Sequence, residues 1–62
     1  MDKRSIYLKA CRLYSEGIQY QIDYELLLEK EPTEENTNLL QLIRESNQRL
    51  YELMKRLTNE KE

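Results

Sequence analysis

The stretch "EKEPTEEN", residues 29–36, holds the single proline of this 62-residue chain and decides how the chain folds. Pro32 disfavours the α conformation at the residue before it, so a helix should end near Glu31. Thr33 is a good N-cap residue. The two glutamates after it would lie in the first turn of a new helix, where the helix dipole favours acidic side chains. This segment therefore predicts a short break between two helices.

Composition favours helices on both sides of the break. The chain has one glycine, is 35% charged, and is rich in Glu, Leu, Lys, Arg and Gln, which are strong helix formers. Two helices of similar length joined by a short turn pack as an antiparallel hairpin. We expect one all-α domain over residues 1–62, with a helix at about 3–30, a turn at 31–33, a second helix at about 34–59 and a short frayed C-terminal tail.

Each predicted helix has a row of residues spaced alternately four and three apart, which is the heptad spacing of helices that pack with a left-handed twist. In the first helix this core row is Ile6, Ala10, Leu13, Gly17, Tyr20, Tyr24 and Leu27. In the second helix it is Leu39, Ile43, Ser46, Leu50, Leu53 and Leu57. We expect the two core rows to face each other.

A second apolar row lies beside the first, and one neighbouring helix cannot cover both. An apolar strip of this length usually marks an interaction site, so we expect a homodimer that forms a four-helix bundle. The alternative is a hairpin that packs on itself and leaves some tyrosines exposed. The residues expected at the interface are Tyr7, Cys11, Tyr14, Ile18, Ile22, Leu26, Tyr51 and Met54.

Gly17 is the one glycine and lies in the middle of the first predicted helix. Glycine there costs roughly 0.5–1 kcal/mol relative to alanine, which is tolerable if it allows the second helix to come close. In an antiparallel hairpin Gly17 lies opposite Gln48, and we expect Ser46 or Asn47 to bind a tyrosine hydroxyl nearby. The alternative is a kink at Gly17 that shapes a binding groove.

Charge is divided between the two ends of the predicted hairpin. Residues 16–45 hold eight acidic and two basic residues, a net charge of −6, and the rest of the chain has a net charge of +4. Two copies packed head to tail would place each acidic turn beside the other's basic end. The acidic tip is also a candidate site for a basic partner, with a solvated loop as the alternative. It comprises Glu25, Glu29, Glu31, Glu34 and Glu35.

The composition argues against chemistry at a site. There is no histidine, the usual general acid or base at neutral pH, and the single Cys11 can form neither an internal disulfide nor a Cys/His zinc site. We expect no catalytic, cofactor or metal site. No apolar run approaches the ~20 residues that cross a bilayer, and no signal peptide is evident. A lone cysteine fits a reducing compartment, so we expect a cytoplasmic protein without membrane contact.

Five tyrosines and an arginine-rich second half are typical of protein interfaces. We expect a small non-enzymatic interaction module, a regulator or inhibitor that docks on a larger bacterial protein and is encoded by a phage or mobile element. The alternative is a dimeric RNA- or DNA-binding hairpin, because the layout resembles plasmid-encoded RNA-binding hairpin dimers in architecture alone. The mixed charge and a pI of about 5.2 argue against it, since phosphate binding needs a continuous cationic face.

Overall fold

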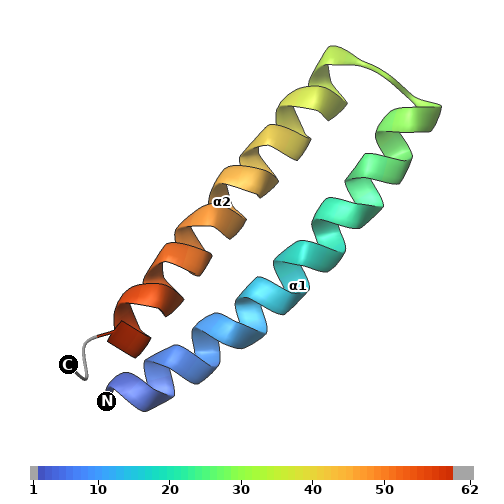
Figure 1. Ribbon diagram of the computed structural model, residues 1–62. Helices are drawn as coiled ribbons and strands as arrows, with labels where there is room; N and C mark the ends of the chain where they lie inside the picture. The colour runs from blue at the N-terminus through green and yellow to red at the C-terminus, as the bar shows by residue number, and fades with distance from the viewer. Residues whose placement is uncertain (1, 60–62) are drawn as a thin grey trace.

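The structure is a computed structural model that describes residues 2–59, and this part of the chain forms two α-helices (Figure 1). Helix α1 spans Lys3–Lys30 and helix α2 spans Glu34–Asn59. They run antiparallel, side by side, and the hairpin measures 45 × 15 × 15 Å. The all-helical hairpin expected from the sequence is confirmed. The expected frayed C-terminal tail lies outside the described residues.

Local hydrogen bonds define where the helices begin. The Asp2 side chain accepts from the backbone N–H of Ser5 at 2.8 Å, which caps α1 and lowers the pKa of Asp2. Thr33 caps α2 as expected, because its Oγ1 accepts from the backbone N–H of Asn36 at 3.1 Å. The side-chain amide of Asn36 donates to the backbone carbonyl of Glu31 at 3.0 Å. This bond ties the end of α1 to the start of α2 across the turn.

The helices meet through faces rotated from the expected core rows. All residues of the observed contact rows are buried or half-buried. The contact row of α1 is Tyr7, Ala10, Tyr14, Gly17, Gln21, Tyr24 and Leu28, and that of α2 is Asn36, Leu40, Ile43, Asn47, Leu50, Met54 and Leu57. These rows keep the heptad spacing but replace every second member of the expected rows. The expected rows were wrong at Leu13 and Tyr20, which are 52% and 62% exposed, and at Ser46 and Leu53, which are also exposed.

A polar contact at the middle of the hairpin accounts for this rotation. Asn47 is buried, at 5% exposure, and its Nδ2 donates to the Gly17 carbonyl and to Oε1 of Gln21, both at 3.0 Å. A Cβ atom on Gly17 would overlap Oδ1 of Asn47 and lie 3.0 Å from its Cγ. Glycine therefore makes room for the asparagine. The expectation of a tyrosine partner was wrong, and α1 continues through Gly17 as one helix.

The interior of the hairpin is thin. Among residues 2–59, the only buried apolar residues are Ala10 and Leu40, and no large side chain is fully enclosed. The other apolar members of the contact rows are half-buried, since two helices touch along a single line. A packed core in a globular protein instead surrounds each large side chain with many neighbours. The hairpin therefore encloses little apolar surface by itself.

Candidate interaction surface

One long side of the hairpin carries the cross-helix ion pair. Nη2 of Arg44 donates to Oε2 of Glu25 at 3.1 Å, and Gln21 donates to the same oxygen at 3.4 Å. These hydrogen bonds lower the pKa of Glu25, and the bond from Arg44 has the larger effect. The side chains of Arg44 and Glu25 are 50% and 41% exposed, so the ion pair contributes little to stability. Its value here is geometric, because it shows which flanks of the two helices share a side. We call this the bridged side.

Aromatic residues occupy the bridged side nearer the open end. The rings of Tyr14 and Tyr51 lie 6.1 Å apart between centroids and are tilted by 40°. Nζ of Lys55 lies 5.9 Å from the centroid of the Tyr51 ring, within cation–π range. Tyr51 is exposed, so this group forms part of the outer surface.

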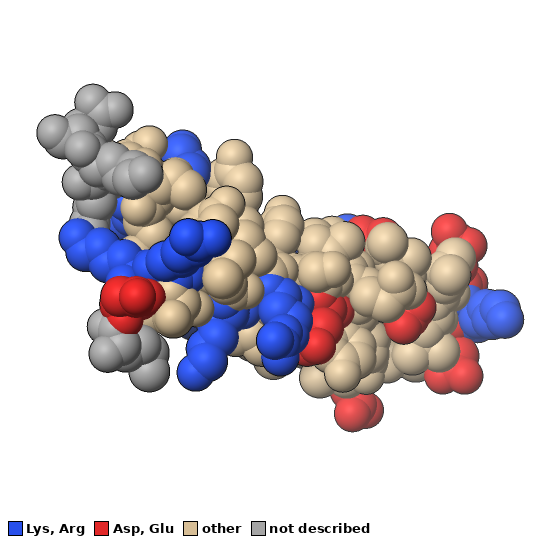
Figure 2. Space-filling model, turned by 90° about the horizontal axis from the view of Figure 1, so that it is seen from below, with Lys and Arg blue, Asp and Glu red and all other residues tan. Residues whose placement is uncertain are grey.

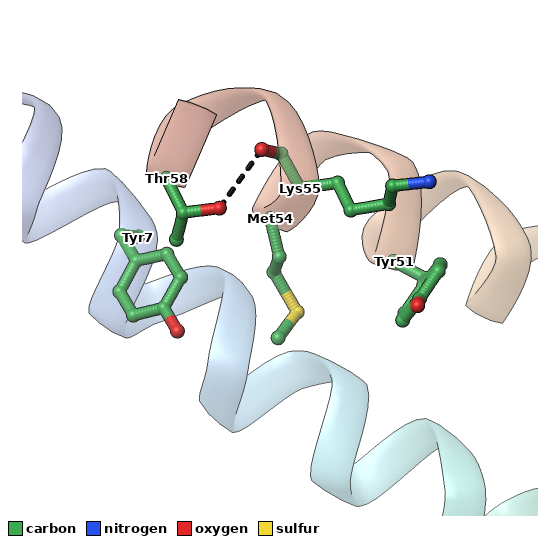
Figure 3. A pocket seen from close by; sticks show the side chains of 5 residues that line it. All are labelled: Tyr7, Tyr51, Met54, Lys55 and Thr58. Atoms are coloured by element: carbon green, nitrogen blue, oxygen red, sulfur yellow. Dashed lines mark hydrogen bonds between the residues drawn. The ribbon is translucent and has the colours of Figure 1, made fainter. Parts of the chain in front are cut away.

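A shallow depression lies beside these rings (Figure 3). Met54 points from α2 toward α1 between Tyr7 and Tyr51, and the Thr58 hydroxyl donates to the Lys55 carbonyl at 2.9 Å. Its volume of about 170 Å³ is below the ~300–1,000 Å³ of small-molecule sites. Hydrogen bonding with the Cys11 thiol raises the pKa of Tyr7. We see no catalytic arrangement among the lining residues.

The opposite side of the hairpin is apolar. The heptad positions that hold Glu25 in α1 and Arg44 in α2 lie on one flank of each contact row. The other flanks must therefore share the opposite side, since the two edges of an antiparallel helix pair face away from each other. We call this side the apolar face. Its residues are Ile6, Leu13, Tyr20 and Leu27 from α1, with Leu39, Ser46 and Leu53 from α2.

The apolar face runs the full length of the hairpin. The Gly17–Asn47 contact fixes which residues lie at the same level along the two helices. Leu13 lies level with Leu53 toward the open end, and Tyr20 lies level with Ser46 near the middle. Along this strip Leu13, Tyr20, Ser46 and Leu53 are exposed, and Ile6, Leu27 and Leu39 are half-buried. Exposed apolar patches of this kind mark sites of association.

The residues expected at an interface fall into several places. Tyr7, Tyr14 and Met54 belong to the contact rows inside the hairpin, and Cys11 and Ile18 are half-buried on the bridged side. Ile22, Leu26 and Tyr51 are exposed. The eight residues do not share one surface, and their contact with another molecule stays a prediction. The apolar face was not predicted from the sequence, because the heptad spacing assigns Leu13 and Tyr20 to the core.

Charge separates along the molecule (Figure 2). On the face shown, basic side chains gather at the open end and acidic side chains toward the turn. The described open end, residues 2–15 and 46–59, has seven basic and two acidic residues, a net charge of +5. Residues 16–45 have a net charge of −6.

The acidic tip keeps four exposed carboxylates, at Glu29, Glu31, Glu34 and Glu35, whereas Glu25 is half-buried and bound to Arg44. A cluster of acidic residues can also signal a cation site. Within residues 2–59, however, no group of three or more His, Cys, Asp or Glu side chains is arranged to hold a metal ion. The tip is therefore an electrostatic feature of the surface.

Neither described helix has the length and hydrophobicity to span a membrane. No family model matches the chain, and comparison with curated proteins and with solved structures also found no match.

Proposed function

We propose that this protein is a small non-enzymatic interaction module that dimerises into a four-helix bundle and acts as a cytoplasmic regulator or inhibitor by docking on a larger protein. One observation carries the proposal. Eight large apolar side chains in the described part of the chain are 40–62% exposed, against two buried apolar residues. Surface of this kind on so small a fold needs a second chain.

Energetics support association. A chain of about 60 residues buries only about 60% of the surface that its unfolded form exposes, so folding alone is marginal. Small scaffolds usually gain stability from disulfides, a metal or oligomerisation. This chain has one cysteine and no histidine, which leaves oligomerisation as the available route. Two hairpins that stack side by side would form a four-helix bundle, in which each covers apolar side chains that the other leaves exposed.

The surface chemistry supports a role in binding proteins. Tyrosine and arginine are enriched at binding hot spots, and here Tyr20, Tyr51 and Arg49 are all exposed. The shallow depression offers neither the volume nor the groups of an active site. The acidic tip gives a partner with a basic surface a complementary place to dock, which would speed association more than strengthen it.

A second candidate function has one observation in its favour. The basic residues of the open end gather at one end of the molecule, as nucleic-acid contacts would require (Figure 2). A gel mobility assay with total RNA and duplex DNA tests this function. Binding that weakens steeply as salt rises would support it, since phosphate contacts release counterions. No shift even at low salt would remove it.

Sedimentation equilibrium across micromolar concentrations, with circular dichroism on the same samples, tests the lead proposal. We expect twice the 7.6 kDa chain mass, with helix content and melting temperature falling on dilution, because association stabilises the fold by mass action. A chain that stays a single 7.6 kDa unit, and whose melting temperature ignores concentration, would contradict self-association.

A further inference from the structure

On α1, the apolar strip is wider on the bridged side than on the apolar face. Two heptad positions, an inner and an outer one, lie outward from the contact row on each side. On the bridged side both are apolar or small between residues 8 and 22, with Cys11 and Ile18 at the inner position and Leu8, Ser15 and Ile22 at the outer one. On the apolar face the outer position is charged throughout, with Lys9, Glu16, Asp23 and Lys30. The bridged side of α1 is therefore the broader apolar surface.

The bridged side of α2 is mostly polar, which restricts how a second copy can stack there. Its outward residues between 41 and 58 are Gln41, Arg44, Gln48, Tyr51, Lys55 and Thr58. With both turns at one end, α1 of one copy would lie over α2 of the other, and Ile18 would cover Gln48 of the second copy. With the turns at opposite ends, each helix lies over its own equivalent, so apolar residues meet apolar residues. Burial of unpaired polar groups disfavours the first arrangement.

The apolar strip of α1 is symmetric about Ser15. Leu8 and Ile22 each lie seven residues from Ser15, and Cys11 and Ile18 lie four and three residues from it on either side. When Ser15 lies over Ser15 of an antiparallel copy, Leu8 lies over Ile22 of that copy, and Cys11 lies within one residue of its Ile18. The strip therefore matches a second copy of itself.

The polar strip of α2 is symmetric about Tyr51, since Arg44 and Thr58 each lie seven residues from it. Tyr51 contacts Tyr14, the residue before Ser15, so the centres of the two strips lie at the same level of the hairpin. The buried polar contact at mid-hairpin gives the same correspondence to within two residues, about 3 Å of helix. One twofold axis that runs across both helices at this level therefore relates each strip to itself.

We infer that the bridged side is the dimer interface, and that two copies stack on it with each helix antiparallel to its own equivalent. This inference rests on the proposed self-association and specifies its surface and orientation. Cys11 lies over Ile18 of the second copy, and Tyr51 meets its own equivalent at the axis. Leu8 meets Ile22 of the second copy at the rim, where truncation of a side chain costs little. The apolar face lies outside this dimer.

Two features of the bridged side gain partners in this stack. The depression between Tyr7 and Met54 lies beside Cys11, and Ile18 of the second copy lies over it (Figure 3). Its volume of about 170 Å³, too small for a small-molecule ligand, suits a single apolar side chain. At each end of the interface Arg4 lies level with Glu25 of the second copy, which adds an opposite-charge pair.

The overlap of the two copies fits a small specific interface. The shared centre places residues 3–26 of α1 against the second copy, about 35 Å of helix at 1.5 Å per residue. With the 15 Å width of the hairpin this gives a flat footprint of about 500 Å². Small specific interfaces bury about 600 Å² per partner, and interdigitating side chains bury more than a flat footprint. The two turns project beyond the overlap, so the acidic tip stays exposed.

A pair of matched tyrosine substitutions tests the surface. Tyr51 on the bridged side is 45% exposed, and Tyr20 on the apolar face is 62% exposed. By sedimentation equilibrium we expect Y51E, which sets two glutamates against each other at the axis, to raise the dimer dissociation constant at least about 100-fold. We expect Y20E to change it less than about 3-fold. A Y51E variant that dimerises as tightly as the parent would overturn the interface while leaving self-association intact.

Two cysteine variants test the orientation, each made with C11S. Both S15C and S46C replace an exposed serine, but Ser15 lies on the bridged side and Ser46 on the apolar face. In the antiparallel stack residue 15 meets its own equivalent across closely packed helices, near the ~4.4–6.8 Å Cα separation that a disulfide needs. With both turns at one end, residue 15 would instead lie over α2 of the second copy.

Mild oxidation should give a disulfide-linked dimer for S15C and none for S46C on a non-reducing gel, with the sedimenting mass unchanged. If the chain is dimeric and S15C stays reduced, the proposed orientation is wrong. If the unsubstituted chain is monomeric at all concentrations, the proposed function fails first and the interface with it. Circular dichroism of every variant confirms that the helices are retained.

Discussion

Replacing Gly17 with alanine should test the contact that sets the packing of the two helices. In an exposed helix this change stabilises by roughly 0.5–1 kcal/mol, because alanine loses less backbone entropy than glycine. Here the new Cβ would overlap Oδ1 of Asn47 and lie 3.0 Å from its Cγ. The amide must move away, yet it is buried and held by two hydrogen bonds.

The magnitude follows from those two bonds. Each neutral hydrogen bond contributes about 1 kcal/mol, so losing both costs about 2 kcal/mol. Subtracting the gain in helix propensity leaves G17A destabilised by roughly 1 kcal/mol. The sign should reverse once Asn47 is replaced by alanine. In an N47A background the new methyl group has space, and G17A should stabilise by roughly 0.5–1 kcal/mol.

Urea unfolding followed by circular dichroism at 222 nm measures all four proteins of this double-mutant cycle. The protein concentration must be equal in each melt, since association adds to the apparent stability. Two effects of opposite sign would establish the contact between the glycine and the asparagine. If G17A stabilises the protein equally with and without Asn47, the close approach of the two helices is refuted.

Three further outcomes follow from single contacts. L40A should lose about 2 kcal/mol or more of unfolding free energy because Leu40 is buried, whereas L8A at an exposed site should stay within about 0.5 kcal/mol of the parent in urea melts. T33A should lose about 1 kcal/mol in the same assay by removing the cap of α2, and T33S should keep it. R44Q should raise the pKa of Glu25 toward its ordinary value, as NMR titration of the carboxyl group would show. Because folding lowers this pKa, the pair stabilises the protein above the unfolded-state pKa. That stability is lost as pH falls through the lowered folded-state value, so the advantage of the parent over R44Q should vanish in acid, and an advantage independent of pH would contradict the ion pair.

The candidate surface was only partly accessible from the sequence. Hydrophobic periodicity shows that apolar residues extend around more of α1 than one neighbouring helix can cover, and the exposure of Ile22 and Leu26 agrees with this. Periodicity does not show which of the apolar residues stay exposed. The heptad spacing predicts that Leu13 and Tyr20 are buried, and in the structure both are exposed. Exposure depends on the rotation of each helix about its axis, which a list of apolar residues constrains weakly.

The sequence by itself determined the hairpin. Pro32 and Thr33 end one helix and start the next through backbone sterics and capping, and these effects act within a few residues. The single mid-helix glycine likewise predicted a place where the helices approach closely. The charge division between the turn and the open end is also a property of the sequence alone.

Only the tertiary structure decided which faces meet. The expected and observed rows of α1 share Ala10, Gly17 and Tyr24, and differ in whether Tyr20 or Gln21 stands between them. Apolarity predicts Tyr20 at this position of the contact row. In the structure Gln21 occupies it, because Gln21 and the Gly17 carbonyl together accept hydrogen bonds from the buried amide of Asn47. A buried polar group needs its partners in three dimensions, and those lie 26 and 30 residues away along the chain.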